Sequence, residues 1–259
     1  MKIGVIGAGG WLGGAIVESM LLAGITVPET LSLSYRSKRP DRFQGANWTT
    51  DNQAVADRSD VIIVSVRPQD WPSVAVSTPG KLVISVMAGV PLATLCERHG
   101  TERVVRSLPN AAAEVRNSYT PWVASDGVNE GDRAAVRAIF GACGVQDEVT
   151  SESDIDYLTG LTGSGPVFPA LLATAMMKHA ISHGVSPEMA RRAVNMVLVG
   201  AGRLIELHGD APENVVETFL DYRGTTAAAI DTMRLAGFEQ AVARGLMAVF
   251  EESLSIGSS

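Results

Sequence analysis

The chain has 259 residues, which is enough for two domains or one large one. Hydrophobic residues make up 46% and charged residues 19%, as in globular proteins, so general disorder is excluded. The net charge of −7 argues against a nucleic-acid partner, because binding a phosphate backbone needs a basic surplus. No segment is apolar for long enough to span a membrane, and Cys96 and Cys143 lie far apart without metal-ligand spacing. We therefore expect a cytoplasmic protein with no metal site.

The first residues predict a turn that binds a nucleotide. Residues 3–6 form a short apolar run typical of a buried strand, and glycines lead from it into a helical pattern over residues 15–22. Glycines permit a tight turn and let the backbone approach phosphates, while a helix N-terminus offers free N–H groups. The arrangement is typical of a dinucleotide pyrophosphate site. The residues expected at the cofactor are Gly7, Gly9, Gly10, Trp11, Leu12 and Gly13.

The spacing of these glycines leaves two registers open. Gly7, Gly9 and Gly13 follow the pattern G-x-G-x-x-x-G, one residue longer than the usual G-x-G-x-x-G. Ala8, Gly10 and Gly13 fit the shorter spacing with alanine in the first place. The sequence does not decide between a longer loop and a shifted register.

The rest of the first half alternates strands and helices. Strands are predicted at residues 31–35, 61–66 and 82–86 and from residue 104, with helices at 51–58 and 91–99. Continuous apolar strands separated by helices indicate a parallel sheet covered on both faces. Only helices follow residue 151, at 166–182, 187–207, 212–220, 225–235 and 238–253. We predict an α/β fold, with a Rossmann-type doubly wound domain over residues 1–150 and an all-helical domain over residues 151–259.

The helix predicted at residues 166–177 is apolar nearly all round. Such a helix must be buried on every side, and a helical domain of this size has limited means to bury it alone. We expect burial in a homodimer interface; the alternative is a central position in one bundle.

The end of the second strand indicates which nicotinamide cofactor binds. NAD sites usually place an acid there to accept from the ribose 2′-OH. Here the strand runs into Arg36-Ser37-Lys38-Arg39, and no acid follows until Asp41. Three cations suit a 2′-phosphate, although a solvated basic turn is the simpler alternative. We expect NADP(H), contacted by Tyr35, Arg36 and Ser37.

Several phrases across both halves resemble one family. They are Val66-Arg67-Pro68-Gln69, Ser85-Val86-Met87-Ala88-Gly89-Val90, Arg106-Ser107-Leu108-Pro109-Asn110, Leu161-Thr162-Gly163-Ser164-Gly165-Pro166 and Gly224-Thr225-Thr226. The whole chain resembles the pyrroline-5-carboxylate reductase family, NAD(P)H enzymes that make proline by reducing a cyclic imine. The resemblance implies a helical C-terminal domain that dimerises by interlocking with its partner.

The resemblance also implies roles for individual residues. Further cofactor contacts are expected where strands end, at Val66, Arg67, Pro68, Met87, Ala88, Gly89 and Asn110. Substrate contacts are expected at Thr162, Arg223, Gly224, Thr225 and Thr226. Thr226 is the expected catalytic residue, through a hydrogen bond to the imine nitrogen, and the N–H groups of Gly224 and Thr225 would bind a carboxylate.

The chain departs from the family where substrate should bind. The family turn Ser-Pro-Gly-Gly is replaced by Asp221-Tyr222-Arg223-Gly224. Asp221 would repel a substrate carboxylate, whereas Arg223 could attract one. The sequence therefore predicts an NADPH-dependent reductase of a cyclic imine, with 1-pyrroline-5-carboxylate as the first candidate. Reduction of a different imine, or a non-catalytic NADP-binding regulatory role, remains an alternative.

Hydride transfer to an imine needs no strong general acid, so no catalytic histidine is required. His99, His179, His183 and His208 are expected at solvated helix positions. The 3-hydroxyacid dehydrogenases also resemble the chain at residues 163–165. They need a lysine about one helical turn further on, where Pro169 stands, and are therefore disfavoured.

Overall fold

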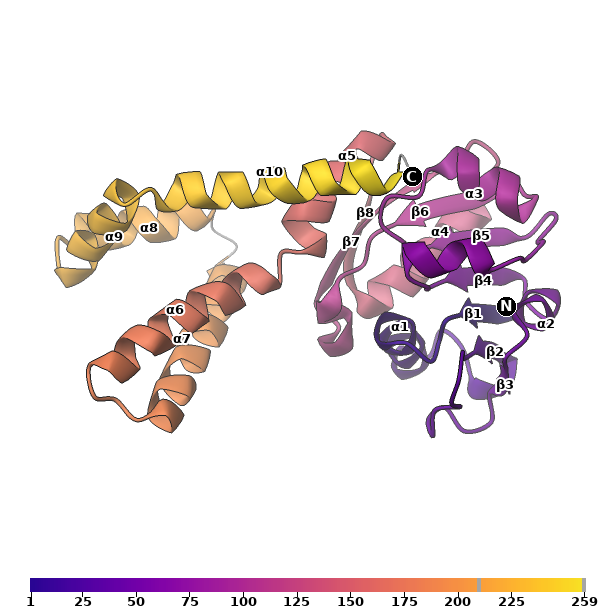
Figure 1. Cartoon of the computed structure of the whole chain (residues 1–259), viewed down its shortest axis with the longest axis horizontal. Helices are drawn as coiled ribbons and strands as arrows, with labels where there is room; N and C mark the ends of the chain where they lie inside the picture. Colours follow the sequence, from indigo (N-terminus) through magenta and orange to yellow (C-terminus); the bar gives the residue numbers. More distant parts are fainter. Residues whose placement is uncertain (209–210, 258–259) are drawn as a thin grey trace. The chain divides into compact units, whose positions relative to one another are not determined.

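The computed structural model describes residues 1–208 and 211–257. Within these residues eight strands form one sheet in the order β3-β2-β1-β4-β5-β6-β7-β8 (Figure 1). The strands are β1 (Ile3–Ile6), β2 (Leu31–Ser34), β3 (Asn47–Thr49), β4 (Val61–Val64), β5 (Leu82–Ser85), β6 (Val104–Ser107), β7 (Ser118–Ala124) and β8 (Gly144–Glu148). All neighbouring strands are parallel except β6 and β7.

Helices connect the strands and continue alone after β8. The α-helices are α1 (Trp11–Leu22), α2 (Asn52–Asp57), α3 (Leu92–His99), α4 (Glu130–Cys143), α5 (Glu152–Leu158), α6 (Val167–Ser182), α7 (Pro187–His208), α8 (Pro212–Asp221), α9 (Thr225–Leu235) and α10 (Phe238–Gly257). Among the described helices, none combines the length and apolar character needed to cross a membrane.

The sheet is buried on both faces, as the continuous apolar strands predict. In β4 alternate side chains enter different cores: Val61 and Ile63 pack with α1 and α4, and Ile62 and Val64 with α2 and α3. Because β1 is central and the chain turns first to β2 and then back to β4, the strand order reverses beside β1. The carboxyl ends of strands beside such a reversal form the crevice where doubly wound sheets bind ligands.

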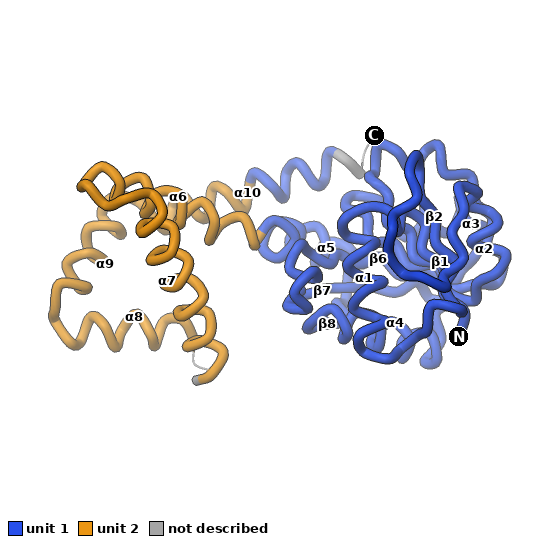
Figure 2. The backbone as a smooth tube through the Cα atoms, turned by 90° about the horizontal axis from the view of Figure 1, so that it is seen from below, with its two compact units in different colours: residues 1–164, 248–259 blue, residues 165–247 orange. Residues whose placement is uncertain are grey.

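The described chain divides into two compact units (Figure 2). Unit 1 holds residues 1–164 and 248–259, and unit 2 holds Gly165–Met247, so one boundary falls within α10. The division expected near residue 150 stays a prediction. In unit 2, α6 packs with α7 and α8 with α9.

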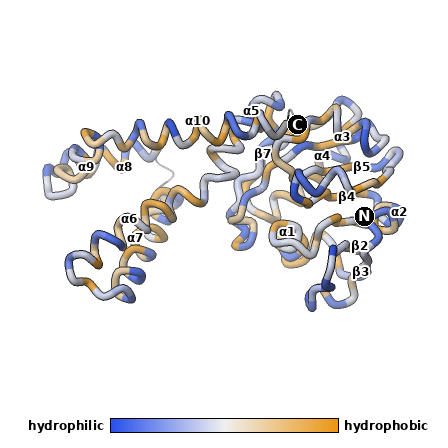
Figure 3. The backbone as a smooth tube through the Cα atoms, in the orientation of Figure 1, coloured by the Kyte–Doolittle hydropathy of each residue, from blue (hydrophilic) through white to orange (hydrophobic). Residues whose placement is uncertain are grey.

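Helix α6 of unit 2 is not enclosed in the single chain. Leu171 is 70% exposed and Val167 is also exposed, while Ala173 is the buried residue recorded for this helix. Hydrophobic segments run along α6 and α7 in Figure 3. This finding removes the alternative of a central bundle helix and leaves an apolar surface that needs a partner.

The structure extends and corrects the predicted elements. The predicted strands and helices are present to within two residues, except that the first helix begins at Trp11 instead of residue 15 and the last helix continues to Gly257. The strands β3, β7 and β8 and the helices α4 and α5 were not predicted from the sequence. Strand β8 is polar and half-exposed at a sheet edge, and β7 contains Pro121, so neither shows an apolar run.

The expectation for His99 was wrong. His99 ends α3 but is fully buried, because the helix packs that side on the sheet; its Nδ1 lies 3.0 Å from the carbonyl oxygen of Val76. His179, on α6, and His183, directly after it, are exposed, as expected. The side chain of His208 lies outside the described part of the structure.

Candidate active site

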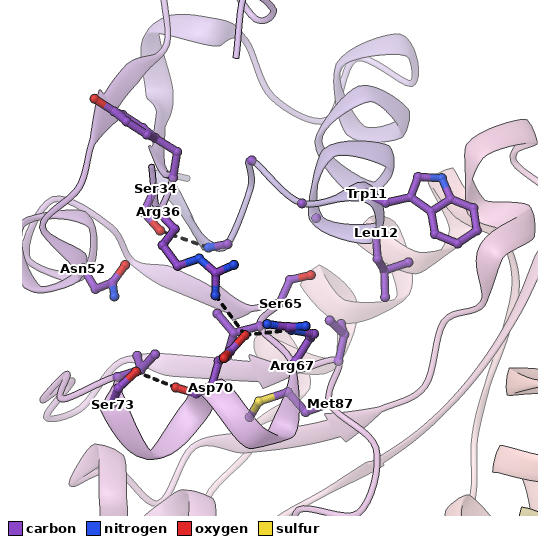
Figure 4. A pocket seen from close by; sticks show the side chains of 18 of the residues that line it. Trp11, Leu12, Ser34, Arg36, Asn52, Ser65, Arg67, Asp70, Ser73 and Met87 are labelled. Carbon is purple, nitrogen blue, oxygen red and sulfur yellow. Dashed lines mark hydrogen bonds and ion pairs between the residues drawn. The ribbon is translucent and has the colours of Figure 1, made fainter. Parts of the chain in front are cut away.

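A cavity of about 810 Å³ lies in unit 1 at the carboxyl ends of β1, β2, β4 and β5 (Figure 4). Its size falls in the range of cofactor sites. The glycine loop, the basic turn after β2 and the segments after β4 and β5 all contribute. Of the predicted cofactor contacts, it is lined by Gly7, Gly9, Gly10, Trp11, Leu12, Gly13, Tyr35, Arg36, Ser37, Val66, Arg67, Pro68, Met87 and Ala88.

The geometry of the glycine loop shows which glycines are required. Gly7 has φ +86°, and a Cβ there would lie 2.2 Å from the carbonyl oxygen of Ser65. A Cβ on Gly13 would lie 2.7 Å from the carbonyl oxygen of Gly7. At Gly10 the same distance would be 3.2 Å, which is tight but less severe. The backbone therefore favours the longer register, in which Gly7 and Gly13 are the required glycines. Leu12, within this loop, is half-buried and packs against the core.

The loop presents backbone donors to the cavity. The first N–H of α1 with a bond inside the helix is that of Gly14, which donates to the Gly10 carbonyl oxygen at 3.0 Å. The N–H groups of Trp11, Leu12 and Gly13 come before this ladder, in the first turn of α1 at the positive end of the helix dipole. Those of Gly9 and Gly10 already donate to the carbonyl oxygens of Ser34 and Gly7. Such a terminus, reached by backbone without side chains, fits a pyrophosphate.

Trp11 stands at the first position of α1 and lines the cavity. It is 64% exposed, and its Nε1 donates to Glu114 Oε2 at 2.8 Å. Glu114 belongs to η3 (Ala111–Val115), which follows Asn110. The hydrogen bond therefore ties the glycine loop to the segment after β6.

The basic turn after β2 meets an acid that the sequence analysis missed. Arg36 Nη1 lies 3.3 Å from Asp70 Oδ2, and Arg67 Nε donates to the same oxygen at 2.8 Å. Asp70 belongs to η2 (Pro68–Ser73) and lines the cavity. The hydrogen bond from Arg67 holds the pKa of Asp70 below its ordinary value. Arg36 is 79% exposed, so a ligand in the cavity can reach its side chain.

Several other lining residues were not among the predicted cofactor contacts. They are Ser34, Lys38, Thr50, Asn52, Ser65, Ser73, Val74 and Val86, besides Asp70. A signal was available for some of them, because Ser65 and Val86 lie at the carboxyl ends of predicted strands. Thr50 and Asn52 follow the short edge strand β3, which showed no pattern in the sequence.

The segment after β5 brings small and apolar groups to the cavity. Met87 is buried, and its N–H donates to Ser85 Oγ at 3.2 Å. Ala88 also lines the cavity, whereas Gly89, with φ +74°, does not. A cofactor contact at Gly89 stays a prediction.

Asn110 and Thr162 lie together but outside the set of residues that line the cavity. The Asn110 side-chain amide donates to the Thr162 carbonyl oxygen at 2.9 Å, and its Oδ1 accepts from the Ala112 N–H at 2.9 Å. The Thr162 hydroxyl donates to the Leu158 carbonyl oxygen at 2.9 Å. Asn110 thus joins the end of β6 to η4 (Thr159–Gly163), and ligand contacts at both residues stay predictions.

The remaining predicted substrate residues belong to unit 2. Gly224 precedes α9, and Thr225 and Thr226 begin it; all three are exposed. Arg223 has φ +50°, and its N–H donates to the Leu220 carbonyl oxygen at 3.0 Å. Arg223 and Asp221, both described, do not form an ion pair with each other. The turn therefore offers a helix N-terminus beside an arginine held in the left-handed region, which favours glycine.

Comparison with known proteins matches both parts of the chain. A family model described as pyrroline-5-carboxylate reductase dimerisation matches residues 152–256. A second, described as NADP oxidoreductase coenzyme F420-dependent, matches residues 2–89. The pyrroline-5-carboxylate reductase of Methanosarcina acetivorans is 33% identical over 99% of this chain and 98% of that protein.

Solved structures show the same fold over the full length. The pyrroline-5-carboxylate reductase of Coxiella burnetii has a TM-score of 0.88 at 25% identity, covering 100% of this chain and 99% of that one. The Plasmodium falciparum enzyme, solved with NADP bound, has a TM-score of 0.85 at 24% identity, covering 99% of this chain and 98% of that one. Because the chain is 33% identical to the Methanosarcina acetivorans protein over nearly its full length, and because its helical region matches the dimerisation model, the chain belongs to the pyrroline-5-carboxylate reductase family.

Proposed function

We propose that this protein reduces 1-pyrroline-5-carboxylate to proline with NADPH. The observation that carries the proposal is the presence in one chain of a nucleotide-sized cavity, built on a glycine loop and a basic turn, and of the family's dimerisation region. The reaction adds a hydride to the imine carbon and a proton to the imine nitrogen. The protein must therefore place the two reactants and stabilise the charge on nitrogen.

The residues of the cavity fit each part of NADPH. The turn from Gly7 to Gly13 and the N-terminus of α1 would hold the pyrophosphate. Arg36, Ser37 and Lys38 would hold the 2′-phosphate, with guanidinium donors that match its oxygens. Met87 and Ala88 would lie along the nicotinamide, where a small side chain permits close approach. When bound, the cofactor supplies the hydride.

The substrate end is assigned to the turn that begins α9. The Thr226 hydroxyl would donate a hydrogen bond to the imine nitrogen, and the N–H groups of Gly224 and Thr225 would hold the carboxylate at the positive end of the helix dipole. Arg223 would add a charge-assisted contact to the same carboxylate. Thr162 is assigned to the substrate on the family resemblance.

We also propose that the protein works as a homodimer in the cytoplasm. The matched dimerisation region contains α6 and α7, whose exposed apolar side chains include Leu171, Met196 and Leu204. An apolar hollow of about 340 Å³ lies between α7 and α8. A second copy would cover this surface. The free thiols of Cys96 and Cys143 support a reducing compartment.

A panel assay tests the function. NADPH consumption would be followed with five- and six-membered cyclic imines, each with and without a carboxylate. We expect the highest kcat/KM with 1-pyrroline-5-carboxylate. Preference for an imine without a carboxylate would instead favour a different substrate. Arg223, in the left-handed region of the altered turn, is the observation that motivates this alternative. Cofactor binding with no turnover of any imine would support a regulatory role.

The cofactor preference has its own test. We expect a higher kcat/KM with NADPH than with NADH, and the Arg36→Ala variant should lose most of the difference. Loss of a charged hydrogen bond of this kind costs about 1.5–3 kcal/mol. Equal efficiency with both cofactors, unchanged in Arg36→Ala, would contradict the proposed 2′-phosphate site.

A further inference from the structure

Asp70 joins two arginines that reach it from different strand ends. Arg36 follows β2, whereas Arg67 and Asp70 follow β4. Arg67 Nε lies 2.8 Å from Asp70 Oδ2, and Arg36 Nη1 lies 3.3 Å from the same atom. Figure 4 shows both guanidinium groups directed at this carboxylate. The cluster bridges the ends of the two strands that flank β1, where the nucleotide would lie.

The arrangement sets Asp70 against a 2′-phosphate. A guanidinium group engaged with a carboxylate has fewer donors for a phosphate, and the carboxylate charge itself opposes a second anion in the same cavity. An aspartate is charged at neutral pH, and the hydrogen bond from Arg67 holds the pKa of Asp70 below even its ordinary value. The cationic turn is therefore partly neutralised before any nucleotide binds.

Asp70 also supplies an acid that the turn after β2 lacks. Acids in NAD sites accept a hydrogen bond from the ribose 2′-OH. Asp41, the next acid after that turn, accepts from Gln44 Nε2 at 2.8 Å and is not among the residues that line the cavity. Asp70 brings a carboxylate into the cavity from another strand end.

We propose that Asp70 is a specificity-determining residue that holds Arg36 and thereby weakens the preference of the site for 2′-phosphorylated nucleotides. The inference rests on the proposed NADPH-dependent function. Binding of a 2′-phosphate exchanges the Arg36–Asp70 pair for an Arg36–phosphate pair. An unphosphorylated nucleotide leaves the Arg36–Asp70 pair intact, so Asp70 penalises only the phosphorylated ligand.

Calorimetry on the full chain tests this without any reduction step. The dissociation constants of 2′,5′-ADP and 5′-AMP would be measured for the parent protein and for Asp70→Asn. We expect Asp70→Asn to raise the affinity for 2′,5′-ADP relative to that for 5′-AMP by about threefold or more. This is the size of effect expected when one exposed charge interaction is removed. The shift should shrink as salt is raised, because these charges are exposed.

Two further variants make the result specific. Asp41→Asn removes the same charge beside the same turn but outside the cavity, and it should leave the ratio unchanged. In an Arg36→Ala background, Asp70→Asn should have a much smaller effect, because the two side chains act on each other. An unchanged ratio in Asp70→Asn would overturn the inference. A shift toward 5′-AMP would also overturn it, by showing that Asp70 instead orients Arg36 for the phosphate.

The two probes keep this inference separate from the enzymatic function. Neither carries a nicotinamide, so failure of the protein to reduce any imine would leave the binding ratio meaningful. Failure of both nucleotides to bind the parent protein would overturn the nucleotide site, and the role of Asp70 with it.

Discussion

Arg106 donates a hydrogen bond to Glu152 at 2.9 Å and so links strand β6 to helix α5. Arg106 is only 3% exposed, and it also pairs with Asp156. Glu152 Oε1 accepts in addition from the Leu92 N–H at 2.9 Å, at the start of α3. One buried guanidinium group thus joins the sheet to the first helix of the region matched by the dimerisation model.

Replacement of Arg106 should strongly destabilise the protein. In Arg106→Met the carboxylates of Glu152 and Asp156 lose their partner, and breaking a fully buried pair costs about 3–5 kcal/mol. That figure is an upper bound here, because the two carboxylates are 34% and 17% exposed. Arg137→Met is the matched control, because Arg137 pairs with Glu130 on the surface of α4 and such pairs contribute about 1 kcal/mol or less. Urea unfolding would measure both. Similar small losses in the two variants would contradict the role of Arg106.

Gly13→Ala should weaken nucleotide binding and lower stability together. The new Cβ would lie 2.7 Å from the Gly7 carbonyl oxygen, and this contact is backbone that cannot move aside. Overpacking of this kind costs about 1–3 kcal/mol. Gly141→Ala in α4 meets nothing within 4 Å and should stabilise the helix by about 0.5–1 kcal/mol. Thermal unfolding with and without NADP would compare the two variants. Equal melting temperatures and equal stabilisation by NADP in Gly13→Ala and Gly141→Ala would contradict the loop geometry.

The buried His99 should make stability depend on pH. Burial lowers its pKa from 6.5, so the unfolded chain takes up a proton that the folded chain resists. Stability should therefore be full above pH 6.5 and fall as the pH drops below it, by at most about 1.4 kcal/mol per pH unit. Arg98, whose charge also opposes protonation, and Trp71 face the ring. Urea unfolding of His99→Gln between pH 5 and 8 should show a flatter dependence than the parent; identical slopes would contradict this.

Arg223→Gly should separate substrate binding from backbone strain. If Arg223 holds the substrate carboxylate, KM for carboxylated imines should rise by about tenfold or more. The same change should raise stability by about 1 kcal/mol, because φ +50° favours glycine. Arg223→Ala should raise KM equally without that gain. Steady-state kinetics and melting would measure both, and Thr226→Ala should lower kcat. Full activity in all three variants would show that the substrate end is misplaced.

The helical region should hold the protein as a dimer or larger assembly. Sedimentation at micromolar concentration should show no monomer for the parent. Leu204→Glu should increase the monomer, because Leu204 lines the apolar hollow between α7 and α8. Arg234→Glu is a polar control on α9, where an exposed cation is exchanged for an anion. A stable parent monomer would count against the proposed interface.

Local patterns were sufficient to predict strands β1, β2, β4, β5 and β6 and many of the residues that line the cavity. In β4 four consecutive apolar residues sit between two cores, which only a doubly covered strand requires. Arg36 could be placed because it directly follows a strand that neighbours the glycine loop. In these cases neighbours in sequence are also neighbours at the site.

The contacts that escaped prediction join segments far apart in the sequence. Asp70 pairs with Arg36 because β4 and β2 flank β1 in the sheet. The two residues are 34 positions apart in the sequence, so no local pattern could predict this contact. His99 looked like a polar helix end, yet the packing of α3 buries it. The register of the glycine loop depended on the position of the Gly7 carbonyl oxygen, which requires coordinates.

Trp11 gives the cavity its own optical signal. Its indole is mostly in solvent and is directed away from the arginine cluster (Figure 4), whereas buried Trp71 lies between the lining residues Asp70 and Ser73. Indole emission overlaps the absorption of a reduced nicotinamide, so a bound dihydronicotinamide nucleotide would quench Trp11 by energy transfer. Ligand occupancy could then be followed by fluorescence in the unlabelled protein, with Trp11→Phe reporting the background from the other tryptophans.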